Sequence, residues 1–308
     1  MREATAVWTV VALPILLAGL AFAAAAFNSV LRAVGAGHPE PARALTDPLR
    51  EAARSLIVQR RGTLAPDRLL TRIGVISLPV AALLAAVVVP IGTEPVARLR
   101  IGVVWFNAME VAVWGAVWLT GWGVNSAYAL IGGYRFIAQG LAYELPHMFA
   151  LITAALGAGS LDLTKVAAAQ DGLWFVVWMP VAFVVYLFSA LAMAFWGPLG
   201  HPVAGDLAGG AAVELSGPDR LVFLAGRYML LVVAAAVAVP LFLGGGAGPL
   251  LPAWTWSLVK TCAVLAALVW ARHRLLVLRM DRFMELSWMV LIPAMLLQAL
   301  VVAIVVLP

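Results

Sequence analysis

Three ionisable side chains lie inside apolar stretches of this sequence: Glu110, Glu144 and Lys260. If these stretches are membrane-crossing helices, and the segment that holds Glu144 begins near Tyr134, each residue lies about 12 to 15 Å along its helix. The hydrocarbon core of a bilayer is about 30 Å thick, so the three side chains are close to its centre. A charge at that depth is costly and usually functional, which favours a proton relay or a charge-coupled switch.

The same residues also allow a structural interpretation, in which neutral glutamates bind a neighbouring helix and one ion pair holds the bundle together. A pair between Lys260 and either Glu144 or Glu110 would lower the cost of burial, and we expect Lys260 or Arg135 near Glu144. His147 follows Glu144 by three residues and can share its helix face. For His147 the simpler interpretation is a buried core histidine with satisfied hydrogen bonds.

Composition places these residues in an integral membrane protein. Of 308 residues, 64% are hydrophobic and 11% are charged, with a mean hydropathy of +1.01, whereas soluble domains have about 25% charged residues. The first apolar stretch is too long for the core of a signal peptide, so we expect it to be retained as a helix. The sequence predicts an all-α fold, a single transmembrane domain over residues 1–308 with about eight spans. The spans are 6–31, 73–91, 102–119, 136–156, 174–195, 221–243, 254–270 and 287–307.

Basic residues set the orientation of these spans. We assign 15 of the 20 Lys and Arg residues to the four connections after spans 1, 3, 5 and 7. The positive-inside rule then predicts that these connections face the cytoplasm and that both termini face outward. Topology therefore explains the net charge of +5 better than a nucleic-acid partner does. The 15 residues are Arg32, Arg43, Arg50, Arg54, Arg60, Arg61, Arg68, Arg72, Arg135, Arg220, Arg227, Arg272, Arg274, Arg279 and Arg282.

A short amphipathic helix is predicted in the first of these connections. Asp47 and Pro48 suit an N-cap and a first helical position, and apolar residues recur at helical spacing up to Ile57. Such a helix lies at the membrane interface, either as a surface anchor or beside a ligand entrance. The tryptophans near the ends of the spans, Trp174 and Trp256 among them, are typical of interfacial anchors.

Residue types that bind metals are sparse and scattered. Cys262 is the single cysteine, so a Cys-based metal or iron–sulfur cluster on this chain is excluded. The four histidines have no spacing typical of a metal site. We therefore expect no metal-bound or covalently bound cofactor on this chain.

Several motifs in one order resemble the H subunit of bacterial NADH-quinone oxidoreductase, respiratory complex I. The first is the run GWGVNSAYALIGGYRFIAQGLAYELP at 121–146, in which GW, NS, YALIGG, Arg135, Gln139 and YEL match. The others are GSLDLTKVAAAQ at 159–170, ELSGPDR at 214–220, GPLLPAWTWSLVKT at 248–261 and RMDRFMELSWMVLIP at 279–293. Together they cover most of the chain from about Pro48 onward.

This resemblance implies a membrane subunit that forms a quinone chamber and couples quinone reduction to proton translocation. Quinone would be a substrate, while other membrane subunits and a hydrophilic peripheral arm would be partners and would hold NADH, flavin and clusters. The chain would lie, surrounded by lipid, in a bacterial plasma membrane as a multi-pass protein. Glu144 and Lys260 match family positions, whereas Glu110 has no clear counterpart. Proton-coupling candidates are Glu144, Glu110, Lys260, Glu214 and Asp206, and quinone-chamber or loop candidates are Arg135, Arg220, Asp281 and Arg279.

Two segments depart from the family pattern. In the connection 197–220 only Asp206 and Glu214 keep acidic positions, and Arg227 stands where the family often has Glu. The segment 32–47 also lacks the usual motif, which leaves the floor of a quinone site unassigned. The alternatives are therefore a related subunit of an energy-converting hydrogenase or formate hydrogenlyase, or an independent transporter or non-catalytic scaffold.

Overall fold

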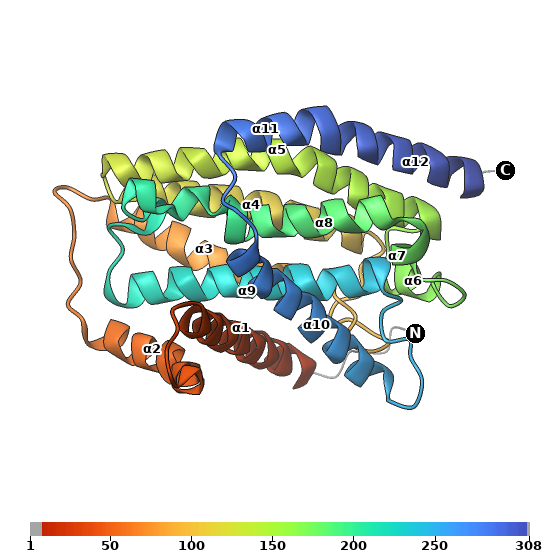
Figure 1. Cartoon of the computed structure of the whole chain (residues 1–308), viewed down its shortest axis with the longest axis horizontal. Helices are drawn as coiled ribbons and strands as arrows, with labels where there is room; N and C mark the ends of the chain where they lie inside the picture. Colours follow the sequence, from red (N-terminus) through yellow and green to blue (C-terminus); the bar gives the residue numbers. More distant parts are fainter. Residues whose placement is uncertain (1–7, 307–308) are drawn as a thin grey trace.

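The computed structural model describes residues 8–306, which form an all-α bundle of roughly parallel and antiparallel helices (Figure 1). The prediction of an all-α fold is therefore confirmed. The helices are α1 (Trp8–Gly35), α2 (Asp47–Ile57), α3 (Arg68–Ala86), α4 (Gly102–Gly123), α5 (Ala127–Ala158), α6 (Leu163–Ala168), α7 (Phe175–Trp178), α8 (Pro180–Met193), α9 (Gly217–Phe242), α10 (Ala253–Arg274), α11 (Met280–Leu286) and α12 (Ile292–Val306). Short 3-10 turns are η1 (Pro41–Thr46), η2 (Gly197–Leu199), η3 (His201–Val203), η4 (Gly205–Leu207) and η5 (Gly210–Ala212), and a π-helical turn, η6 (Ser287–Leu291), joins α11 to α12.

Among the described residues, seven helices are long and apolar enough to cross a membrane: α1, α3, α4, α5, α9, α10 and the continuous stretch Met280–Val306. The shorter apolar helix α8 lies within the bundle beside α5 and α9. Together they account for the eight predicted spans.

The fifth predicted span is interrupted. The sequence predicts one segment over 174–195, but Met179 leaves the helical conformation, with φ −121° and ψ 50°. Pro180 follows, and a proline disfavours the helical region for the residue before it. The segment therefore divides into α7 and α8. This correction leaves α8 with 14 residues.

The helix that carries Glu144 starts earlier than the sequence predicts. Ser126 precedes it and α5 runs from Ala127 to Ala158, so Arg135 lies two turns inside the helix rather than at its mouth. Glu144 is then near the middle of a 32-residue helix. The first turns of α5 pack closely against the loop that holds η3 and η5, where a Cβ atom on Gly132 would overlap the backbone nitrogen of Ala211.

Close helix contacts position α3 against α4. A Cβ atom on Gly74 would lie 2.5 Å from the backbone nitrogen of Thr120, and one on Gly123 would lie 2.5 Å from that of Thr71. Only glycine permits these approaches, which agrees with the enrichment of small residues at helix interfaces in membranes. Helix α9 is the centre of the bundle, because it packs against α1, α3, α8 and α10.

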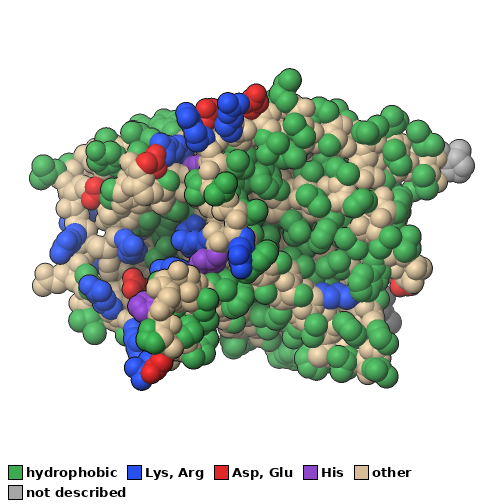
Figure 2. Space-filling view, viewed as in Figure 1, with side chains coloured by type: hydrophobic (Ala, Val, Ile, Leu, Met, Phe, Trp, Pro, Cys, Tyr) green, Lys and Arg blue, Asp and Glu red, His purple; other side chains and the backbone are tan. Residues whose placement is uncertain are grey.

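The connections gather at two opposite ends. At one end the Thr63 hydroxyl donates to the carbonyl of Val124, and the Arg61 amide donates to Ser216 Oγ at 2.7 Å. These contacts join the loops that precede α3, α5 and α9. Most charged side chains on the face in Figure 2 lie over this end, and hydrophobic side chains cover most of the remainder.

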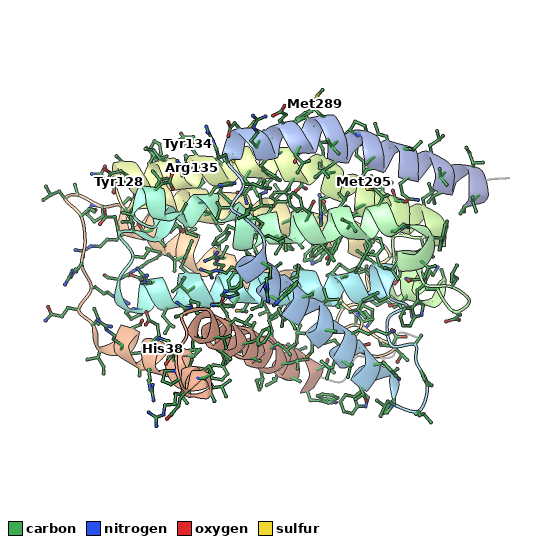
Figure 3. All side chains as sticks on the ribbon, in the orientation of Figure 1. His38, Tyr128, Tyr134, Arg135, Met289 and Met295 are labelled. Carbon is green, nitrogen blue, oxygen red and sulfur yellow. The ribbon has the colours of Figure 1, made fainter. Side chains whose placement is uncertain are left out.

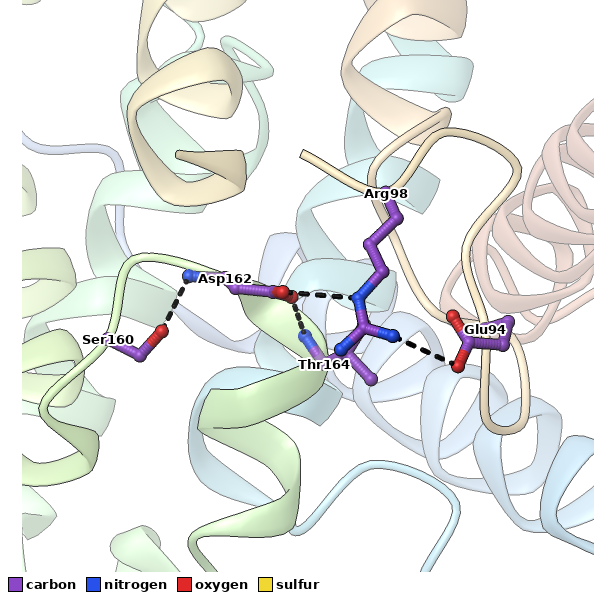
Figure 4. Close-up of polar contacts among 5 residues, drawn as sticks. All are labelled: Glu94, Arg98, Ser160, Asp162 and Thr164. Atoms are coloured by element: carbon purple, nitrogen blue, oxygen red, sulfur yellow. Dashed lines mark hydrogen bonds and ion pairs between the residues drawn. The ribbon is translucent and has the colours of Figure 1, made fainter. Parts of the chain in front are cut away.

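At the opposite end one ion-pair cluster ties two loops together (Figure 4). The Arg98 guanidinium lies 3.2 Å from the Asp162 carboxylate and 3.4 Å from that of Glu94. Asp162 also caps α6 by accepting the amide of Thr164 at 2.9 Å. An aspartate at a helix N-terminus satisfies a free backbone N–H there. The two sets of loops thus alternate along the chain, as eight successive crossings require.

The predicted amphipathic helix is present as α2 beside α1 and α9. Thr46 is its N-cap residue and Asp47 is its first helical residue, whereas the sequence predicts Asp47 as the cap. None of its residues is buried, and Leu49, Leu56 and Ile57 are 58 to 83% exposed. Exposed leucine and isoleucine opposite arginines suit a helix that lies in the membrane interface.

We expect single cysteines in a Cys262→Ala background to report this topology. An added Cβ meets only Pro66 Cγ at 4.0 Å for Gly62→Cys and nothing within 4 Å for Gly172→Cys, so both substitutions fit. In intact cells an impermeant maleimide should label Gly172→Cys but label Gly62→Cys only after the membrane is opened. The opposite pattern would reverse the predicted orientation.

Candidate functional site

A large cavity of about 1280 Å³ lies between α1, η1, α2 and α9. One part of its wall is apolar, with Ala18, Phe22 and Ala25 from α1 and Leu221 and Leu224 from α9. The other part carries arginines from α1, η1, α2, α9 and α10, which outnumber the acidic residues Glu40, Asp47 and Glu51 of the same lining. A cavity with an apolar wall and a cationic end suits an amphiphilic ligand.

The polar end of this cavity is held by hydrogen bonds between helices. The Asn28 amide on α1 donates to the hydroxyl of Tyr228 at 3.1 Å, and its oxygen lies 3.1 Å from Nε2 of His273. Asn28 is itself buried and lines the cavity. These contacts fix α1 against α9 and α10.

Two arginines of the same wall contact one tryptophan. The guanidinium carbons of Arg227 and Arg272 each lie 4.8 Å from the centre of the Trp196 ring. Arg227 also donates to the carbonyls of Ala194 and Phe195, which follow the last residue of α8. Free carbonyls at a helix C-terminus attract a cation. Arg227 therefore binds the end of α8, which explains how an arginine is tolerated where the resembled family often has a glutamate.

The smaller cavity, about 720 Å³, brings four predicted site residues together. Arg135, Asp206, Arg279 and Asp281 all line it, and Arg135 Nη1 lies 2.8 Å from Asp206 Oδ2. Figure 3 shows Arg135 beside Tyr134 on the first half of α5. Arg227 and Arg272 line this cavity as well as the larger one.

His201 adds a titratable group to this smaller cavity. Burial lowers the pKa of His201, the nearby Arg135 lowers it further, and Asp206 opposes the change. Since the unperturbed value is about 6.5, the imidazole is neutral at pH 7. The cavity therefore takes its charge from the arginines and aspartates.

The two remaining loop candidates lie elsewhere. Arg220 lines the larger cavity. Glu214 lines neither of the two cavities and accepts a hydrogen bond from the Ser126 hydroxyl at 2.9 Å. It thus fixes the loop before α9 to the start of α5.

A buried polar cluster lies between α4, α5 and α8. His147 Nε2 is 3.1 Å from Glu110 Oε2, with the two side chains 0% and 1% exposed. Glu144 is one turn before His147 and is also buried. The oxygens of Glu144 fall short of hydrogen-bond geometry, although the Asn107 side chain from α4 lies close to the carboxylate. The sequence interpretation of His147 as an ordinary core histidine misses its pairing with Glu110.

The expected pairing of Lys260 with a carboxylate is wrong. Its ammonium donates to the carbonyls of Leu243, Gly245 and Ala247 at 2.6, 3.0 and 2.7 Å. It also lies 4.2 Å from the ring of Trp174, which makes a cation–π contact in addition to any interfacial role. The reason is packing: α10 lies against α9 and α1, away from the buried cluster. Arg135 is likewise paired with Asp206 rather than placed near Glu144.

Comparison with known proteins agrees with this architecture. The sequence model of the NADH dehydrogenase family matches residues 39–303. The chain belongs to this family. It is 36% identical over 269 residues to an H subunit of NADH-quinone oxidoreductase from Geobacter sulfurreducens, a match that covers 83% of this chain and 82% of that protein. It is also 34% identical over 214 residues to the H subunit of NADH-quinone oxidoreductase from Geobacillus kaustophilus, which covers 68% and 64% of the two chains.

Family membership confirms the resemblance that the motifs indicate. The matched range begins before α2 and ends within α12, so it includes the main helices of the smaller cavity, most of those of the larger one and the buried cluster. The bacterial relatives and the apolar helices identify a multi-pass bacterial membrane protein.

We expect Lys260→Met to destabilise the protein because three carbonyl oxygens lose their donor. An unsatisfied buried group costs about 1–3 kcal/mol, so the temperature of half-inactivation in detergent should fall by about 5 °C or more. Adding Glu144→Gln should not restore it, since distant sites act independently. A double variant more stable than Lys260→Met alone would show that the two side chains form a pair after all.

Proposed function

We propose that this chain is the membrane subunit of an NADH-quinone oxidoreductase that forms the quinone chamber and couples quinone reduction to proton translocation. The observation that carries the proposal is the cavity between α1, α2 and α9 in a member of the NADH dehydrogenase family. NADH, flavin and iron–sulfur clusters are held by partner subunits. The chain acts as a single transmembrane domain.

The larger cavity fits the chemistry of a membrane quinone. A quinone has an apolar isoprenoid tail and a polar head with two carbonyl oxygens, which accept hydrogen bonds. The apolar residues of α1 and α9 suit the tail, and the arginine-rich end, with Arg220, Arg227 and Arg272, suits the carbonyl head. Helix α2 lies in the membrane interface beside this opening, where a quinone enters from the bilayer.

The buried carboxylates Glu144 and Glu110 carry the translocated protons. Glu144 and Glu110 lie in the middle of α5 and α4, where an unpaired charge is costly and protonation relieves that cost. Asp206 is paired with Arg135 at the charged end of the bundle. Glu214, in the loop before α9, accepts a hydrogen bond from Ser126 at the start of α5. We propose that protons enter at that charged end and pass along α5 to Glu144. Lys260 has a structural role, because it joins α10 to the carbonyls that follow α9.

Other subunits cover this chain in the membrane and at its charged end. The basic excess supports a cytoplasmic position for that end, with both termini outside. The arginines and aspartates of the smaller cavity face the same end, where a hydrophilic arm contacts the membrane part. Lipid covers the apolar faces that no partner covers.

We expect a bulky residue in the larger cavity to impair quinone use. Ala25→Phe adds a ring to the cavity wall on α1, whereas Val11→Phe changes an exposed position of the same helix outside the cavity. In complex purified through this chain in mild detergent, Ala25→Phe should raise the KM for quinone about tenfold. Electron transfer from NADH to ferricyanide, which does not require the quinone chamber, should stay normal in both variants. An unchanged KM in assembled Ala25→Phe would contradict the chamber assignment.

We expect Glu144→Gln to assemble but to lose proton-coupled turnover. Glutamine keeps the shape and hydrogen-bonding capacity of the side chain but cannot titrate. Removing one proton carrier lowers rates by about 100-fold in typical cases, so NADH-driven acidification of proteoliposomes should fall at least tenfold. The control variant is Thr153→Val on the same helix. Gln139 is a poorer control position, because its side chain donates to the Ala192 carbonyl of α8. Normal pumping by Glu144→Gln would show that Glu144 carries no proton and has only a structural role.

A further inference from the structure

His147 is the imidazole at the centre of the buried cluster, and it touches groups from three helices. Glu110 approaches its Nε2 from α4, Glu144 and Tyr143 precede it on α5, and Tyr186 approaches from α8. The Tyr186 ring lies 5.0 Å from the imidazole and the Tyr143 ring 6.4 Å. These are the ionisable groups that face His147 among the described residues. Its full burial excludes bulk solvent from both ring nitrogens.

The two ring nitrogens have different surroundings. Nε2 lies 3.1 Å from Glu110 Oε2, at an angle that falls short of a hydrogen bond, whereas Nδ1 has neither an ion-pair contact nor a hydrogen bond among the described residues. The oxygens of Glu110 and Glu144 and Oδ1 of Asn107 also fall short of hydrogen-bond geometry, although the Asn107 side chain lies close to Glu144. Buried polar atoms are nearly always satisfied in native proteins. Unsatisfied donors and acceptors that gather around one imidazole are typical of a site where protons move.

We propose that His147 is a relay residue that passes a proton between Glu144 and Glu110. This inference rests on the proposed function, in which these carboxylates carry protons. Protonated Glu144 gives its proton through one water to Nδ1 of neutral His147, and His147 gives its Nε2 proton to the Glu110 carboxylate. An N–H bond forms at Nδ1 and one breaks at Nε2. Glu144 becomes a carboxylate, Glu110 becomes a carboxylic acid and the imidazole stays neutral in its other tautomer.

The geometry favours a relay over direct transfer between the two carboxylates. They lie on different helices, α4 and α5, and the imidazole lies against Glu110 while sharing a helix face with Glu144. Histidine suits this role because each of its nitrogens can donate or accept. The rings of Phe106, Tyr143 and Tyr186 pack around the imidazole.

The test uses the assembled complex in proteoliposomes and compares His147→Gln with Thr153→Val. Thr153 is buried on the same helix, and its hydroxyl donates to the carbonyl of Phe149 in its own helix. We expect His147→Gln to lower NADH-driven proton pumping at least tenfold, while electron transfer from NADH to ferricyanide stays normal. Thr153→Val should pump normally. Wild-type pumping by assembled His147→Gln would overturn the relay.

A second variant separates a relay from a structural partner. If His147 only compensates the charge of Glu110, then His147→Arg, which keeps a permanent cation at this position, should restore pumping. If His147 carries the proton, His147→Arg should assemble but remain at least tenfold impaired, because arginine cannot be deprotonated in proteins. Restored pumping would therefore also overturn the proposal.

The Glu144→Gln variant distinguishes failure of this inference from failure of the proposed function. Impaired Glu144→Gln with normal His147→Gln would reject only the relay. Normal pumping by both variants, in a complex that reduces quinone, would reject the assignment of proton transfer to this cluster.

Discussion

A charged or polar group inside a membrane must find its partners within the protein, because the hydrocarbon offers no water. The structure meets this constraint for two cations in the same way, by placing each at the end of a helix. Lys260 binds carbonyls just after α9, and Arg227 binds carbonyls just after α8. Both groups of carbonyls would otherwise be free. The cations thus hold helix ends and loops in place, and the positions of α8, α9 and α10 depend on them.

The cluster around Glu110 lacks this kind of compensation. Glu110, Glu144 and His147 lie in the middle of α4 and α5, where backbone groups are already used within the helices. Their compensation must come from one another, and the 3.1 Å pair of Glu110 and His147 is the contact that provides it. Among the described residues Glu144 has no ion pair of this kind, and the neutral Asn107 side chain lies close to it. The cluster is therefore the part of the bundle in which a change of protonation has the largest electrostatic effect.

Hydropathy predicts most of the fold, because each span must be apolar over a length fixed by the bilayer. It also places Glu110 and Glu144 near mid-membrane, and the structure has both in the middle of long helices. Hydropathy cannot predict which helices are neighbours. For this reason the sequence predicts a buried carboxylate as the partner of Lys260, whereas the structure pairs it with backbone carbonyls. The break at Met179 depends on one proline within an apolar run. The role of His147 depends on α4 lying against α5, although its spacing from Glu144 indicates a shared face.

Helix α8 joins the wall of the cavities to the buried cluster. Its last turn precedes the carbonyls that bind Arg227, whose side chain lines both cavities. Tyr186, eight residues before Ala194 and so about 12 Å away along the helix, faces His147. One short helix thus contacts both the cationic wall and the imidazole. Because Arg227 holds the end of α8 by hydrogen bonds, the wall of both cavities and the ring contact with His147 depend on the position of the same helix.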